Sequence, residues 1–98
     1  MNGPVWGQAS DDLNATLLAW DAGEGPDEHV NAERDVFVFV SEGSVEVTID
    51  DEARVLEAGE GVIIAKGSRR SLTAGADGVR YVSVHLRRPP LQIGGTPR

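Results

Sequence analysis

The sequence contains no cysteine among its 98 residues, so neither a disulfide bond nor a thiolate metal site is available to it. It also lacks a long apolar run, since stretches such as residues 62–65 are far too short to cross a bilayer. The first residues have neither the basic start nor the apolar core of a signal peptide. These absences predict a cytoplasmic protein that does not interact with a membrane.

Basic residues are scarce as well. The formal net charge of −7 argues against non-specific binding to nucleic acid, which requires lysine and arginine to neutralise phosphates. The charges are unevenly distributed, because residues 1–60 hold 15 of the 16 acidic residues while residues 61–98 hold seven of the nine basic ones. If the two halves interleave in one barrel, this asymmetry predicts salt bridges across its surface.

The pattern that is present is one of short β-strands. Alternating apolar residues and β-branched residues dominate, and no segment keeps a helical period. The pattern predicts strands over residues 16–20, 35–40, 44–49, 53–56, 62–65, 69–73 and 79–86, turns at 42–43, 50–52 and 58–61, and a loop over 74–78. This spacing, in a chain long enough for one domain, favours a sandwich or a barrel.

The second of these strands is apolar on both faces, because Val36, Val38 and Val40 alternate with Phe37 and Phe39. One face of a lone small barrel should meet water. We therefore expect the phenylalanine face to be covered by the N-terminal segment or by a second subunit. On this basis the sequence predicts a homodimer.

Two blocks of the sequence space glycines and polar residues at fixed intervals. In the first, intervals of five, one, four and six residues separate Gly23, His29, Asn31, Val36 and Gly43. In the second, intervals of five, one, two and three residues separate Gly59, Ala65, Gly67, Arg70 and Ala74. Gly43 and Gly59 stand where tight turns require positive φ, and Gly67 stands at a similar corner.

These intervals resemble the two motifs of the cupin superfamily, G-x5-H-x-H-x3,4-E-x6-G and G-x5-P-x-G-x2-H-x3-N. The resemblance implies an all-β fold, a cupin-type double-stranded β-helix or jelly-roll barrel. It divides the chain into a barrel over residues 13–88, a tail over residues 89–98, and an N-terminal segment over residues 1–12. That first segment forms either an edge strand or a crossing to a partner subunit.

In cupins, as the resemblance implies, three histidines and one glutamate project into the barrel and hold Fe, Mn, Zn or Ni. His29 is the only one of these four residues retained here; Asn31 and Arg70 replace histidines, and Val36 replaces the glutamate. A catalytic metal needs about three protein ligands, and the fixed charge of Arg70 repels a cation. We therefore expect neither a metal nor another cofactor.

Other residues do not restore the metal site. Strand alternation points Asp35 away from the pocket, so a site built from His29, His85 and Asp35 needs placements that the pattern does not support. His85 shares one strand face with Tyr81 and Ser83. The candidate ligand-binding residues are therefore His29, Asn31, Val36, Arg70, Tyr81 and His85.

The roles of His29 and Arg70 each have two interpretations. His29 is either a remnant of the metal motif that hydrogen-bonds across the pocket or a proton carrier. Arg70 either binds a carboxylate or phosphate in the pocket or extends to solvent and pairs with an acid such as Glu28. An inward Arg70 requires an anionic or carbonyl partner, because an unpaired buried guanidinium is costly.

Three functions are compatible with these residues. The one we favour is a metal-independent barrel that binds a small organic acid or carbonyl compound in an apolar cavity bounded by Val36, Val38, Val45 and Val47. The second is a metal-independent isomerase, epimerase or lyase that uses His29 as its acid and base. The third is a dimeric scaffold or interaction protein without a ligand. The sequence does not decide whether the protein is an enzyme, because function depends on the site rather than the fold.

Overall fold

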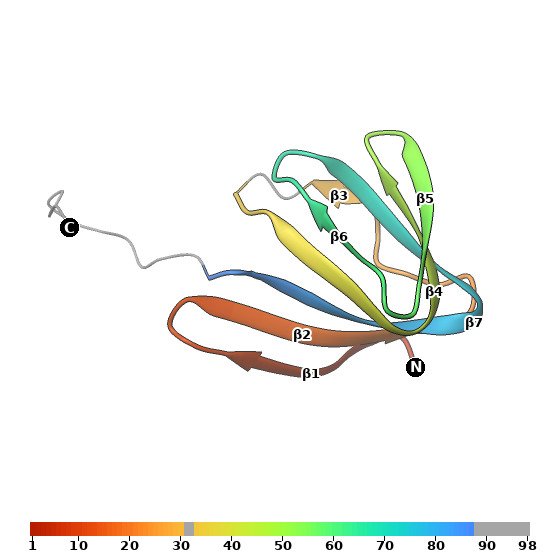
Figure 1. The fold of residues 1–98 in the computed structure, drawn as a ribbon, viewed down its shortest axis with the longest axis horizontal. Helices are drawn as coiled ribbons and strands as arrows, with labels where there is room; N and C mark the ends of the chain where they lie inside the picture. Colours follow the sequence, from red (N-terminus) through yellow and green to blue (C-terminus); the bar gives the residue numbers. More distant parts are fainter. Residues whose placement is uncertain (31–32, 88–98) are drawn as a thin grey trace, which may run out of the picture.

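A computed structural model describes residues 1–30 and 33–87, and every regular element in it is a β-strand. The strands are β1 (Gly3–Ala9), β2 (Leu13–Trp20), β3 (His29–Val30), β4 (Val36–Ile49), β5 (Glu52–Glu57), β6 (Gly61–Ile64) and β7 (Arg69–Leu86) (Figure 1). They pair in the order β1-β2-β7-β4-β5, while β3 pairs with β7 and β6 with β4. The described residues include no helix long and apolar enough to span a membrane.

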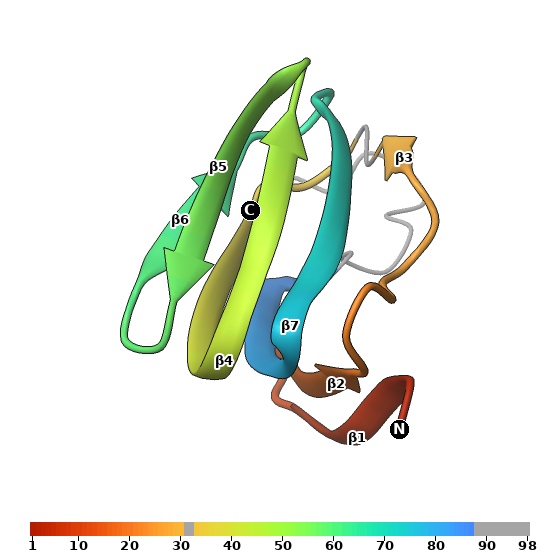
Figure 2. The same ribbon diagram turned by 90° about the vertical axis from the view of Figure 1, so that its right-hand side faces the viewer.

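The strands form two facing layers because β4 and β7 are long enough to run through both. The first layer contains β1, β2, β6, residues 36–40 of β4 and residues 79–86 of β7. The second layer contains β3, β5 and the remaining parts of β4 and β7. Figure 2 shows β4 and β7 lying side by side along their length. The prediction of an all-β jelly-roll barrel is confirmed.

Two predicted interruptions are wrong, because the turn at residues 42–43 lies within β4 and the loop at residues 74–78 lies within β7. The chain bends at these places without leaving the sheet. The register between β4 and β7 shifts on both sides of Gly43, as expected for β-bulges at a corner. Gly43 has φ 75°, and a Cβ atom there would lie 2.1 Å from the carbonyl oxygen of Gly78. The glycine signal therefore marks a bend and a close backbone approach rather than the end of a strand.

The hydrophobic core lies between the two layers. Val40, Val47 and Ile64 are completely buried there, and the burial of β4 alternates along its length as the sequence predicts. Phe37 and Phe39 point the opposite way and are 41% and 38% exposed. β1 pairs edge to edge with β2 in the same layer, so it extends this sheet and does not cover the two phenylalanines.

Candidate functional site

A cavity of about 140 Å³ lies between the two layers, and we call it the inter-layer cavity. Most of its wall is aliphatic, with Leu18 from β2, Val36 and Val38 from β4, Ile64 from β6 and Leu72 from β7. These side chains come from both layers and face one another because alternate strand residues point inward. Contact of this aliphatic wall with an apolar group is favoured over its contact with water.

The polar part of the cavity wall comes from β7, which contributes Arg70, Tyr81 and Ser83. Arg70 is half-buried, and this desolvation lowers the pKa of its guanidinium from the ordinary value. Tyr81 is 3% exposed. Burial raises the pKa of its phenol, an effect that Trp20 and the charge of Arg70 partly offset. At neutral pH the cavity therefore presents a cation beside a neutral phenol.

The indole of Trp20, which also lies in the first layer, influences the pKa of the Tyr81 hydroxyl. Its Nε1–H is buried, and within the part of the chain that the structure describes it has no partner at hydrogen-bonding distance and angle. Trp20 nevertheless opposes the rise in the Tyr81 pKa. The two groups are thus close enough to interact electrostatically, but their geometry falls short of a hydrogen bond.

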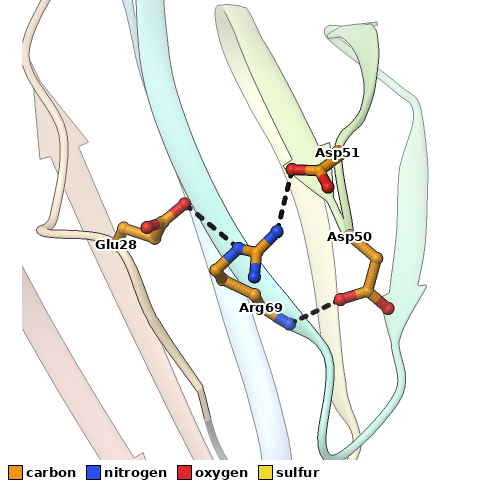
Figure 3. A network of polar contacts seen from close by, with 4 residues as sticks. All are labelled: Glu28, Asp50, Asp51 and Arg69. Atoms are coloured by element: carbon orange, nitrogen blue, oxygen red, sulfur yellow. Dashed lines mark hydrogen bonds and ion pairs between the residues drawn. The ribbon is translucent and has the colours of Figure 1, made fainter.

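A polar network around Arg69 lies on the outer surface at the start of β7 (Figure 3). The backbone N–H of Arg69 donates to Asp50 Oδ1 at 2.9 Å, and its Nη2 donates to Asp51 Oδ1 at 2.8 Å. Its Nε lies 3.7 Å from Glu28 Oε2. Because neighbouring strand residues point to opposite faces, Arg69 faces outward while Arg70 lines the cavity. These ion pairs join the acidic and basic halves of the sequence, as the charge distribution predicts.

The acidic members of the network occupy a two-residue hairpin turn. Asp50 and Asp51 have φ values of 48° and 73°, and the flanking Ile49 and Glu52 pair across the turn. Two successive positive φ values are typical of a type I′ turn, which matches the twist of the strands that it connects. The turn therefore presents both carboxylates to Arg69 from the second layer.

Three of the predicted ligand-binding residues, Val36, Arg70 and Tyr81, line the inter-layer cavity. His29 lies in β3, and its backbone pairs with that of Arg70 in β7. Asn31 lies outside the described residues. Their roles stay predictions, including that of His29 as an acid and base.

His85 is half-buried on β7 opposite Asn14, outside the cavity wall, and its Nδ1 lies 2.9 Å from the carbonyl oxygen of Leu86. Val45 and Val47, expected to bound the cavity, pack in the core without lining it. These three residues share inward-facing strand positions with cavity residues but lie at other levels along their strands.

Sequence reasoning missed several residues of the wall, namely Leu18, Pro26, Ile64 and Leu72. Leu18 could have been recognised from strand alternation, because Leu18 and Trp20 are two residues apart and therefore lie on the same face of β2. Pro26 comes from the segment between β2 and β3, for which strand patterns give no orientation. Backbone bonds from Gly23 N–H to Ala74 O (2.9 Å) and from Ala74 N–H to Glu24 O (2.8 Å) hold this segment against β7.

The donor set on the cavity wall does not fit the transition metal that the cupin resemblance implies. Val36, at the position of the glutamate ligand, lines the cavity with an isopropyl group that has no lone pair. Arg70, at the position of a histidine ligand, brings a positive charge to the same space. Among the side chains that the structure describes, which do not include that of His29, no group of three or more His, Cys, Asp or Glu residues is placed to hold a metal ion.

A second and larger hollow, of about 610 Å³, lies near the bends of β4 and β7. Its wall includes Asp21, Glu42, Asp77 and Arg80, all of which are exposed to solvent. Water screens charges at such an open surface, so they bind a small ligand weakly. The smaller inter-layer cavity is the better candidate because its charged group is partly desolvated and faces an apolar wall.

Comparisons with known proteins agree with this architecture. The family described as "Cupin domain" matches residues 16–85, and no curated protein matches the chain. KdgF from Halomonas sp. is 20% identical with a TM-score of 0.77, covering 85% of this chain and 76% of its own. The protein TT1209 from Thermus thermophilus is 23% identical with a TM-score of 0.77, covering 91% and 84%. The Cnp3 cupin domain of Schizosaccharomyces pombe is 16% identical with a TM-score of 0.75, covering 89% and 64%. At these identities the similarities establish the fold alone.

Proposed function

The chain belongs to the cupin domain family, and from that premise we propose that it binds a small organic acid or carbonyl compound in the inter-layer cavity. The observation that carries this proposal is the placement of Arg70, whose guanidinium lines a cavity with a largely aliphatic wall. A guanidinium presents several N–H donors in one plane, which matches the two oxygens of a carboxylate. Partial burial strengthens such a pair because less water competes for it.

Tyr81 supports the same class of ligand. Its neutral hydroxyl lies in the cavity with Arg70 and donates one hydrogen bond to a carboxylate or carbonyl oxygen. Burial keeps the phenol protonated, so it adds no negative charge that would repel an acid. The cavity thus combines a cation, a neutral donor and an apolar surface, a combination suited to an organic anion.

Thermal-shift measurements with a panel of carboxylic acids and their neutral carbonyl analogues test this function. We expect the melting temperature of the wild-type chain to rise with ligand concentration, because a ligand that binds only the folded state stabilises it. Arg70→Ala should lose the response to acids. Arg80→Ala removes an exposed arginine from the same strand and should keep it. A wild-type chain that responds to no member of the panel, or an Arg70→Ala variant that responds fully, contradicts the proposal.

We also propose that two copies of the chain associate through the outer surface of the first layer. Strand register places Trp6, Leu17, Val82 and Phe39 next to one another in a row across four strands. The large apolar residues on this surface are 38–67% exposed, namely Trp6, Leu13, Phe37, Phe39, Ile63 and Leu86. Together they expose roughly 600 Å², taking about 150–250 Å² for each full side chain.

The size and charge of this surface favour a second copy as its partner. Its apolar area is at the upper limit for a monomer, and with a polar rim it approaches the roughly 800 Å² per subunit of a standard interface. The described strand residues of the first layer include no acidic residue, although the chain carries a net charge of −7. Two such chains repel each other least where their acidic residues are farthest from the contact.

A further inference from the structure

We infer that the ligand of the inter-layer cavity is an aliphatic monocarboxylic acid of about four to six carbons, a conclusion that rests on the proposed function. Three properties of the cavity wall lead to this class: the volume, the number of charges and the separation of polar from apolar groups. Each of them excludes a different kind of organic acid.

The volume limits the length of the acid. A cavity of about 150 Å³ lined by aliphatic residues accommodates benzene, which has six non-hydrogen atoms. The inter-layer cavity has almost the same volume, about 140 Å³. By this comparison it encloses about six non-hydrogen atoms, the size of butanoate, and its open side leaves room for the further methylenes of pentanoate and hexanoate. Sugar acids and aromatic acids with substituents are too large for it.

The charges on the wall limit the ligand to one carboxylate. Among the described residues that line the cavity, Arg70 is the one charged group, and the others are aliphatic or carry a hydroxyl. One carboxylate matches this single positive charge. A second carboxylate would lie against aliphatic side chains without a cationic partner, and burying such a charge is costly. The same argument disfavours a phosphate ester, which carries nearly two charges at neutral pH.

The arrangement of the wall gives the ligand an orientation. Arg70, Tyr81 and Ser83 all come from β7, while β4 and β6 contribute only aliphatic side chains, including Val38 and Ile64. The carboxylate accordingly lies beside β7, and the alkyl chain extends toward β4 and β6. An acid with a hydroxyl or amino group at the far end of its chain would bury that group without a hydrogen-bonding partner.

Isothermal titration calorimetry with a series of straight-chain acids from acetate to octanoate tests the size limit. We expect the affinity to rise about fourfold for each added methylene up to pentanoate or hexanoate, and to rise no further at octanoate because the added methylenes extend beyond the aliphatic wall. Two further ligands test the charge. Butanedioate and pentanamide should each bind at least about tenfold more weakly than pentanoate, because one adds an unpaired charge and the other removes the charge that pairs with Arg70.

Two substitutions alter the cavity volume without altering its charge. Ile64→Val enlarges the cavity and should move the preferred chain length up by about one carbon. Val36→Leu fills part of it and should move the preference toward shorter acids. If Val36→Leu fails to fold, the Ile64→Val result still decides the question. An unchanged preference in the folded variants places the alkyl chain elsewhere and overturns the inference.

The outcomes separate this inference from the function on which it rests. If no acid of any length binds the wild-type chain, the proposed function is wrong. If acids bind but butanedioate binds as tightly as pentanoate, or affinity keeps rising through octanoate, the function stands and the inferred class is wrong. An affinity that stops rising at four to six carbons, with weak binding of butanedioate, supports both.

Discussion

The outer surfaces of the two layers differ in chemistry although they share the strands β4 and β7. Before its bend β4 directs Phe37 and Phe39 outward, and after the bend it directs Glu46 outward. In β7 the order is reversed, with Arg69 before the bend and the partly covered Val82 after it. The chemistry of each outer surface therefore depends on the layer and not on the strand that crosses it. We interpret the polar surface as facing solvent and the apolar one as facing a second subunit.

The bend of β4 separates these two surfaces, and its loss should have the largest effect. Gly43→Ala places a Cβ atom 2.1 Å from the Gly78 carbonyl oxygen at a residue with φ 75°. We expect it to lower the free energy of unfolding by about 3 kcal/mol or more, measured by urea denaturation. Gly59→Ala is the matched control, since Gly59 also has positive φ, at 91°, but no atom lies within 4 Å of its Cβ position. It should cost only about 1–2 kcal/mol, and equal costs would mean that the close approach at Gly43 is unimportant.

The proposed contact between subunits depends on the apolar surface of the first layer. Phe39→Glu places a charge within it and should weaken the dimer by about 100-fold or more, because a desolvated carboxylate disrupts an apolar interface. Val55→Glu adds the same charge at a 58% exposed position in the second layer and should leave association unchanged. Light scattering coupled to size-exclusion chromatography measures both. A monomeric wild-type chain, or equal effects of the two substitutions, contradicts this use of the first layer.

Tyr81 lies in the first layer but faces inward, so its titration probes the space between the layers. Burial raises the pKa of its phenol above the unfolded value of about 10. The stability that comes from keeping the phenol neutral is complete below about pH 10 and is lost as the pH rises through the folded pKa. The wild-type chain should thus lose stability above about pH 10 more steeply than Tyr81→Phe.

Denaturation curves of the two chains at a series of alkaline pH values measure this difference. At neutral pH the two chains should differ by only about 1 kcal/mol, because a single hydroxyl is removed. Parallel stability profiles up to the alkaline limit would show that Tyr81 is not desolvated in the folded state.

The surface network of the second layer should have the smallest effect on stability. Arg69→Ala removes the hydrogen bond to Asp51 and the ion pair with Glu28, both at the exposed surface. Exposed ion pairs are weak because water and salt screen them, so we expect a small loss of stability that shrinks as salt is added. Thermal denaturation at low and high salt measures it. A larger loss, independent of salt, would mean that the network also supports the position of Arg70.

Much of the fold could be predicted from the sequence because strand alternation and glycine spacing reflect the backbone directly. The alternation of Val36, Phe37 and Val38 gave the correct inward and outward faces, and positive φ at Gly43 and Gly59 was anticipated. Continuity through the bends could not be predicted. A glycine of positive φ produces either a turn or a bulge, and the choice depends on distant partners such as Gly78.

The site was less accessible to sequence reasoning. The motif positions pointed to Val36 and Arg70, and the structure brings these two residues together on the cavity wall; their role in binding stays a prediction. Leu18 and Pro26 enter the wall through contacts that depend on how β2 and the following segment pack on β7. Local patterns carry no information about such long-range packing. The same limit applies to cavity volume, which depends on all the walls together.

The central claim is that an organic acid occupies the cavity beside Arg70 and Tyr81. Tyr81 is the single tyrosine of the chain, so the near-ultraviolet absorbance of tyrosinate reports on this position alone. The positive charge of Arg70 lowers the pKa of Tyr81, and a bound carboxylate would offset that charge and displace water. We expect saturating pentanoate to move the titration midpoint of Tyr81 to higher pH. An unchanged midpoint, at a concentration that calorimetry shows to be saturating, would contradict the claim.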